Sequence, residues 1–271
     1  MTLVSTDWLN ENLYKVKIID ASWHLIKNRN AIEEYNKEHI ENTIFFDLDK
    51  NSNQKKDLPH GHFLPPINEH EKLISEMGIL NSDRIIIYCY SDLISSCRAW
   101  FQFLYFGHDP KLVSVLNGGM KKWKLEGRKV SNLKTKIIPS KYKAKENKNM
   151  IKLKSQIDEN IKKKEFTVID ARSKNRFLGF EPEPRPGIKS GSIKGSKSMP
   201  LTEIVNKEDN TFLDTKKLRD IFNSSEINSN KIVMSCGSSV SAASLALAYS
   251  LINDDYIPKI YIGSWTEFGK K

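Results

Sequence analysis

The sequence predicts an α/β protein built of two tandem domains, each with a mainly parallel sheet covered by helices on both faces. The chain repeats itself: the run Val16–Ala21 ends in Asp-Ala, and so does Phe166–Ala171, 150 positions later. Arg84–Cys89 and Lys231–Cys236 each end a β-branched run in cysteine, 147 positions apart. Segments with helical apolar spacing lie between such runs, and this alternation is typical of α/β domains.

The expected strands are apolar runs of four to six residues, a length that suits buried parallel strands. They lie at 16–21, 84–89 and the start of 113–119 in the first half, and at 166–171, 231–236 and the start of 259–264 in the second. The expected helices cover 68–78, 98–106, 215–222 and 239–251. Because sites in such sheets form at the carboxyl ends of strands, Cys89 and Cys236 are candidate site residues.

Charge is concentrated in one part of the 271-residue chain. Residues 121–164 hold 16 basic and four acidic side chains, a net charge of +12, whereas the whole chain carries +10. The middle of this stretch has few large apolar residues, which predicts an exposed basic linker at 131–149 between domains at 1–130 and 150–271. Nucleic-acid binding is not expected, because Tyr142 is the only aromatic residue within the linker.

Composition excludes several classes of protein. The sequence has no apolar run of 18 residues, so we expect no membrane-spanning helix and no membrane partner. Three cysteines, an odd number, do not make a disulfide scaffold and suit a reducing compartment. The N-terminus has neither the basic start nor the apolar run of a secretory signal. We therefore expect a cytoplasmic protein, and we expect it to be a monomer.

The loop after the run 231–235 is a candidate anion site. Its small residues Gly237, Ser238, Ser239, Val240 and Ser241 follow Cys236 and precede an apolar helix. Small side chains allow the backbone N–H groups to converge, and a helix N-terminus adds partial positive charge, so a thiolate is favoured there. The alternative is a small buried cysteine at a strand end, without chemistry.

Several motifs together resemble one known family. The segment Cys236–Ala242 reads Cys-Gly-Ser-x-Val-Ser-Ala, and Arg176–Arg185 ends in Pro-Glu-Pro-Arg. Phe45–Asp49, His62–Pro65 and Gly263–Phe268 complete the set, in order. This pattern resembles the two-domain rhodanese-type sulfurtransferases, most closely the 3-mercaptopyruvate sulfurtransferases, over nearly the whole chain. The resemblance implies two tandem rhodanese-like domains.

The resemblance also implies roles for individual residues. Cys236 would be the nucleophile that carries sulfur as a persulfide, and Arg176 and Arg185 would clamp an anionic donor. Asp49, His62 and Ser238 would form a relay like that of serine proteases. All six histidines lie in the first half of the chain, so the imidazole would reach an interdomain cleft from the first domain.

The loop also bears on the sulfur donor and on the acceptor. Relatives that use thiosulfate place basic side chains at the two positions after the cysteine, where this chain has neutral Gly237 and Ser238. We therefore expect the small anionic donor 3-mercaptopyruvate, with transfer to a thiol such as thioredoxin or to cyanide. Ser239 stands where the family usually has glycine, which puts the loop geometry in doubt because glycine adopts left-handed angles more freely.

No cofactor is expected, and no metal, because His60 and His62 lack further clustered ligands. A thiosulfate:cyanide sulfurtransferase and a non-catalytic binding module of the same fold remain alternatives. A Cys-x5-Arg phosphatase is disfavoured, because Ala242 stands where its arginine would be. We expect the loop after Cys89 to be inactive, because it is longer and bulkier, with Cys89 or Cys97 as a resolving thiol as the alternative.

Overall fold

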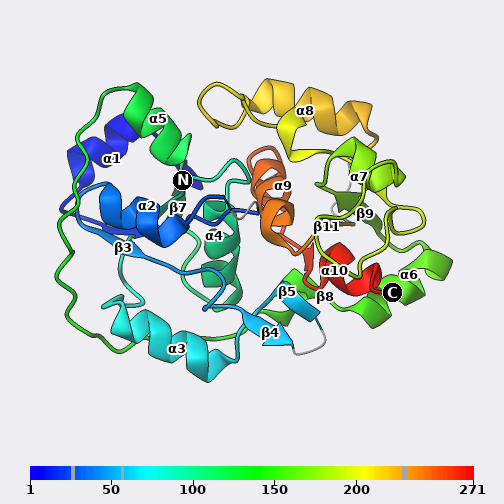
Figure 1. Ribbon diagram of the computed structural model, residues 1–271, viewed down its shortest axis with the longest axis horizontal. Helices are drawn as coiled ribbons and strands as arrows, with labels where there is room; N and C mark the ends of the chain where they lie inside the picture. The colour runs from blue at the N-terminus through cyan, green and yellow to red at the C-terminus, as the bar shows by residue number, and fades with distance from the viewer. Residues whose placement is uncertain (26–27, 56–57, 228–230) are drawn as a thin grey trace. The chain divides into compact units, whose positions relative to one another are not determined.

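The computed structural model describes residues 1–25, 28–55, 58–227 and 231–271 (Figure 1). The chain forms two compact units. The first holds 1–51, 65–147 and 206–212, and the second holds 52–64, 148–205 and 213–271. His62, which the sequence division places in the first half, therefore belongs to the second unit.

The first unit contains a five-stranded sheet in the order β1-β7-β6-β2-β3, and all of its pairings are parallel. Its strands are β1 (Leu3–Val4), β2 (Lys17–Asp20), β3 (Thr43–Phe45), β6 (Ile85–Tyr88) and β7 (Val113–Leu116). Its helices are α1 (Thr6–Asn12), α2 (Ala31–Lys37), α3 (Ile67–Glu76), α4 (Ser96–Tyr105) and α5 (Gly119–Leu125).

The second unit repeats this arrangement with a parallel sheet in the order β10-β9-β11-β12-β8. Its strands are β8 (Ile151–Lys152), β9 (Thr167–Asp170), β10 (Lys197–Ser198), β11 (Ile232–Ser235) and β12 (Ile260–Tyr261), and the antiparallel pair β4 (Asn53–Lys55) and β5 (Leu58–Phe63) joins the unit. Its helices are α6 (Lys154–Lys163), α7 (Lys174–Leu178), α8 (Thr215–Ser224), α9 (Val240–Ser250) and α10 (Ser264–Phe268), with short 3-10 turns η1 (Lys148–Met150) and η2 (Leu201–Glu203).

The internal repeat seen in the sequence is confirmed by the topology. Each sheet has the same order of strands along the chain, and the register is also the same: Asp20 pairs with Tyr88, and Asp170 pairs with Ser235. The predicted strands and helices are all present, with ends that differ by at most three residues. The predicted α/β class is therefore correct.

Both faces of the first sheet are buried. Ile86 and Tyr88 pack into a cluster that contains residues of α1 and α5. Ile85 and Ile87 are fully buried as well, although alternation along a strand turns them to the opposite face. A strand that is apolar at every position is typical of a sheet covered on both sides, as the sequence predicted.

The helix that follows the candidate loop is buried on every side. In α9, all residues from Val240 to Tyr249 are buried. The helix packs against β11, β12 and η2 of its own unit. Because a densely packed interior resists displacement, the N-terminal end of α9 is a firm support for the loop that carries Cys236.

The basic linker is largely exposed and has no helix or strand between 132 and 147. Tyr142 is the exception, since only 2% of its surface is exposed. Its ring stacks on that of His108, with centroids 5.8 Å apart, and its hydroxyl lies 3.2 Å from His108 Nδ1. Tyr142 therefore fixes this segment to the first unit, together with main-chain hydrogen bonds from Ser140 to Ser75 and from Lys145 to Phe106. No helix in the described ranges is long and apolar enough to cross a membrane.

Asp20 provides a prediction about stability. Its carboxylate accepts hydrogen bonds from Ser22, but burial dominates and raises its pKa from 3.8 to about 6. The folded state therefore binds this proton more tightly than the unfolded state, and the free energy of unfolding falls as the pH rises from about 4 to 6. The shift corresponds to about 3 kcal/mol.

We expect Asp20→Asn to raise the free energy of unfolding by about 1–3 kcal/mol at pH 8, because the amide keeps an acceptor without the buried charge. At pH 3.5 the carboxyl is protonated, and the gain should vanish. Urea unfolding of both proteins at the two pH values measures the difference. A variant less stable than the wild type at pH 8 would contradict this account of Asp20.

Candidate active site

Cys236 lies directly after β11 and before the first residue of α9, as the sequence predicted. Only 2% of its surface is exposed. The turn into the helix depends on Ser239, which has a left-handed backbone with φ of 66° and ψ of 3°. For a residue with a Cβ atom this conformation costs about 1–2 kcal/mol. The sequence analysis questioned the loop geometry at this position, and the backbone there is indeed strained. Residues 236–239 nevertheless connect β11 to α9.

Ser264, the first residue of α10, holds the loop by hydrogen bonds. Its hydroxyl oxygen accepts hydrogen bonds from the amides of Cys236 at 3.4 Å and Ser239 at 3.1 Å. The same hydroxyl donates to the main-chain oxygen of Tyr261 at 2.9 Å. The amides of Cys236 and Ser239 are thus engaged by Ser264, and an anion on the sulfur would rely on the other loop amides.

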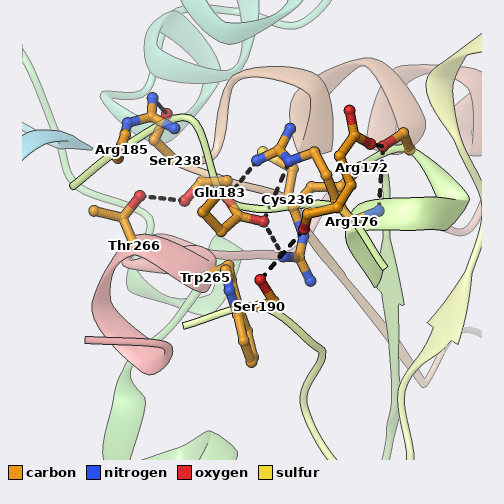
Figure 2. A network of polar contacts seen from close by, with 12 residues as sticks. Arg172, Arg176, Glu183, Arg185, Ser190, Cys236, Ser238, Trp265 and Thr266 are labelled. Carbon is orange, nitrogen blue, oxygen red and sulfur yellow. Dashed lines mark hydrogen bonds and ion pairs between the residues drawn. The ribbon is translucent and has the colours of Figure 1, made fainter. Parts of the chain in front are cut away.

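Three hydrogen bonds to main-chain carbonyls of the loop complete this support. The amide of Trp265 donates to the carbonyl oxygen of Cys236 at 2.9 Å. Thr266 donates to the carbonyl oxygen of Gly237 with its amide at 2.8 Å and with its hydroxyl at 2.6 Å (Figure 2). Because both carbonyls point toward α10, main-chain groups hold the loop. The side chains of Cys236 and Ser238 are not used in these contacts.

Three of the predicted site residues meet at one hydroxyl. Arg185 Nη2 donates to Ser238 Oγ at 2.8 Å, and His62 Nδ1 lies 2.9 Å from the same oxygen. All three residues are buried, and His62 is fully so. Since a guanidinium can only donate, Ser238 Oγ accepts from Arg185, and the direction of its contact with His62 is set by the tautomer of the imidazole.

Arg176 is held by a buried carboxylate. Its Nη2 lies 2.6 Å from Glu183 Oε2, and the other oxygen of Glu183 lies 2.7 Å from Arg172 Nη1. Arg172 also pairs with Asp170 at 2.7 Å, at the end of β9 (Figure 2). Burial opposes the charge of Arg172, but the two carboxylates outweigh it and raise the pKa of the guanidinium. The network thus fixes Arg176 from behind.

Both predicted clamp residues converge on the residue that follows Cys236. A Cβ atom placed on Gly237 would lie 3.0 Å from Arg185 Nη1 and 3.3 Å from Arg176 Nη2. Any side chain at this position would therefore crowd the two guanidinium groups. Two cations beside a buried cysteine make a setting that can hold an anion next to sulfur.

Comparison with known proteins identifies the family of this chain. The model of the rhodanese-like domain matches the chain twice, at residues 5–126 and 153–271. The chain belongs to the rhodanese-like family. The second rhodanese-like domain contains Cys236, Ser238, Arg176 and Arg185, so four of the predicted site residues lie in one copy of the domain.

Named relatives extend over nearly the whole chain. It is 36% identical to the mitochondrial thiosulfate/3-mercaptopyruvate sulfurtransferase 1 of Arabidopsis thaliana, covering 98% of this chain and 75% of that protein. It is 34% identical to human 3-mercaptopyruvate sulfurtransferase, covering 98% and 91%. The crystal structure of a 3-mercaptopyruvate sulfotransferase from Escherichia coli superposes with a TM-score of 0.86 at 28% identity, covering 98% and 99%. This rhodanese-like protein is a sulfurtransferase.

Asp49 lies in the first unit of the rhodanese-like protein. Its Oδ1 accepts a hydrogen bond from Trp23 Nε1 at 3.0 Å. Its place in a relay with His62 stays a prediction. The side chain of His60 lies outside the described residues. Among the residues that the structure describes, no group of three His, Cys, Asp or Glu side chains is arranged to hold a metal ion.

The first rhodanese-like domain carries Cys89 at the position equivalent to Cys236. Met120 N donates to the carbonyl of Cys89 at 3.0 Å, as Trp265 does to that of Cys236. The Cys89 thiol, however, faces the Ser96 hydroxyl at 3.4 Å, and burial raises its pKa. Cys97 is fully buried in α4. The surroundings of Cys89 favour a neutral thiol, and the inactivity of its loop stays a prediction.

The sequence analysis missed three residues that shape the site: Ser264, Thr266 and Glu183. Each lies within a motif that carried the family resemblance, but no role was assigned to it. A glutamate between two prolines, within a segment bounded by Arg176 and Arg185, was a usable signal for Glu183. Ser264 and Thr266 gave no such signal, because their partners lie 28 and 29 positions away.

Proposed function

We propose that the protein transfers sulfur from 3-mercaptopyruvate to a thiol acceptor through a persulfide on Cys236, with release of pyruvate. The observation that carries the proposal is the convergence of the Arg176 and Arg185 guanidinium groups on Gly237, directly after the cysteine. A donor with one carboxylate and a neighbouring ketone offers acceptors to both guanidinium groups. Gly237 itself leaves them the room.

In the proposed reaction the Cys236 thiolate attacks the sulfur atom of the donor. An S–S bond forms and the C–S bond breaks, and the electron pair of that bond passes to the enolate of pyruvate. The enolate carbon then takes the hydroxyl proton of Ser238, a proton from the His62 imidazole replaces it, and pyruvate leaves. Arg176 and Arg185 stabilise the negative charge of the donor and of the enolate. The outer sulfur of the persulfide is next attacked by the acceptor thiolate, which regenerates Cys236.

Ser238 and His62 supply the proton-transfer part of the proposal. The hydroxyl of Ser238 lies 2.9 Å from the imidazole nitrogen, within range for direct proton transfer. Arg185 stabilises the oxygen while the proton is absent. Asp49 is proposed to orient the imidazole, as the family resemblance implies.

The choice of donor follows from the charge of the loop. Gly237 and Ser238 are neutral, and a basic side chain at position 237 would bring a further cation close to Arg185 Nη1, which lies 3.0 Å from a Cβ atom there. We therefore propose that 3-mercaptopyruvate is preferred to thiosulfate. For the acceptor we propose a small thiol or a thioredoxin-type dithiol, with cyanide as a substitute in vitro.

The test is the mass of the intact protein after incubation with 3-mercaptopyruvate alone. We expect a gain of one sulfur atom, about 32 Da, with release of an equal amount of pyruvate. Peptide mapping should place the added sulfur on Cys236. A parallel sample with thiosulfate compares the donors under the same conditions. Faster loading from thiosulfate would overturn the donor assignment, and no loading from either donor would favour a binding module.

A further inference from the structure

Ser239 adopts a backbone conformation that glycine would adopt without strain. Its φ is 66°, in the left-handed region, and its side chain is fully buried. The amide of Ser239 donates to Ser264 Oγ at 3.1 Å, and a glycine would keep this bond. The turn of the loop therefore does not require a serine at this position.

The hydroxyl of Ser239 makes a contact that glycine cannot make. Ser239 Oγ donates to the main-chain oxygen of His62 at 3.2 Å. The two residues are 177 positions apart in the chain and belong to the same compact unit. Because both groups are buried, the bond is shielded from water and holds the end of β5 against the loop.

His62 is thereby held by two successive residues of the loop. Ser238 contacts its ring at 2.9 Å, and Ser239 contacts its main chain at 3.2 Å. Next to it, Phe63 packs against Ile262. A side chain whose backbone and ring are both fixed has little freedom to leave its partner, so the distance between imidazole and Ser238 hydroxyl depends on Ser239.

We propose that Ser239 is a positioning residue for sulfur transfer: its hydroxyl holds the main chain of His62 and thereby places the imidazole against Ser238 Oγ. This inference rests on the proposed function, in which the Ser238–His62 pair moves a proton. Ser239 itself touches no reacting atom. Compared with glycine, the serine costs backbone strain and adds a hydrogen bond that anchors His62.

Two substitutions separate positioning from stability. Ser239→Ala keeps the strained backbone and loses the hydroxyl, whereas Ser239→Gly loses the hydroxyl and relieves the strain. The urea midpoint of Ser239→Ala should fall below that of the wild type. The urea midpoint of Ser239→Gly should lie above that of Ser239→Ala. In both variants we expect kcat with 3-mercaptopyruvate to fall by about three- to tenfold and KM to stay within about twofold.

Ser250→Ala is the matched control, because this serine lies at the other end of α9 and its hydroxyl also donates to a main-chain oxygen, that of Leu247. It should keep the wild-type kcat. In a His62→Gln background, Ser239→Ala should lower kcat no further, since the imidazole that it positions is gone. A Ser239→Gly protein with the kcat of the wild type would overturn the proposal, and so would additive losses in the double variant.

A spectroscopic measurement keeps the inference independent of the proposed reaction. The ring ¹⁵N resonances of His62 can be assigned by their absence from the spectrum of His62→Gln. We expect Ser239→Ala and Ser239→Gly to shift them and Ser250→Ala to leave them in place. Unchanged His62 resonances in both Ser239 variants would overturn the positioning role. If the wild type transfers no sulfur from any donor, the proposed function fails, and these resonances alone decide the role of Ser239.

Discussion

Replacing Cys236 with serine is expected to abolish sulfur transfer, with pyruvate release at least about 1000-fold slower than in the wild type. A serine hydroxyl is not ionised near neutral pH and forms no persulfide. The fold should persist, because the loop is held through main-chain groups: Cys236 donates its amide to Ser264, and its carbonyl accepts from Trp265. The rate of pyruvate release and the intact mass after exposure to the donor measure both effects.

Cys89→Ser is the control for this loss. It removes a thiol at the equivalent strand end, where the carbonyl accepts the corresponding amide, that of Met120. We expect its rate to stay within about twofold of the wild type, because burial raises the pKa of the Cys89 thiol and keeps it protonated. Loss of activity in the Cys89 variant, or loading of sulfur on the Cys236 variant, would contradict the assignment of the nucleophile.

The fold could be predicted because its signals are local and appear twice. The runs 166–171 and 231–236 correspond to β9 and β11, and their counterparts in the first half correspond to β2 and β6. Each run is apolar and β-branched because both sides of the strand are buried, so the pattern is visible without knowledge of partners. The place of Cys236 at the end of β11 followed directly from this pattern.

Contacts between distant segments could not be predicted in the same way. The sequence places 52–64 in the first half, whereas contacts place this segment in the second unit. The hydroxyl oxygen of Ser264 accepts hydrogen bonds from two loop amides. The residues next to it in the sequence do not distinguish it from other serines near a helix start. Such partners are set by how two helices pack, which the spacing of apolar residues does not encode.

Glu183→Gln is expected to lower both stability and activity. The side chain of Glu183 is 2% exposed and forms ion pairs with two guanidinium groups, those of Arg172 and Arg176. The amide keeps the shape but loses the charge, so Arg176 is left in a buried place without its counter-ion. Loss of one partner from a buried ion pair costs about 3–5 kcal/mol, and we expect a decrease of about 3 kcal/mol in the free energy of unfolding.

The same change should loosen the clamp on the donor. Arg176 Nη2 lies 2.6 Å from Glu183 and faces Gly237 with the same nitrogen, so its position depends on the carboxylate. A displacement of about 1 Å in a substrate-positioning group costs about 100-fold in rate, and kcat/KM for 3-mercaptopyruvate should fall by about that factor. Assays well below the unfolding transition of the variant separate this effect from loss of fold.

Glu181→Gln, on the same segment, is the control. It shows whether loss of any negative charge there has the effect or only loss of the Glu183 charge. Glu181 is exposed, and its carboxylate accepts only a long bond from Ser173 Oγ at 3.2 Å among its described contacts. We expect its free energy of unfolding to change by less than about 0.5 kcal/mol and its kcat/KM to stay at the wild-type value. If Glu183→Gln behaved like Glu181→Gln, Arg176 would be held by other groups, and the clamp would not depend on the buried network behind it.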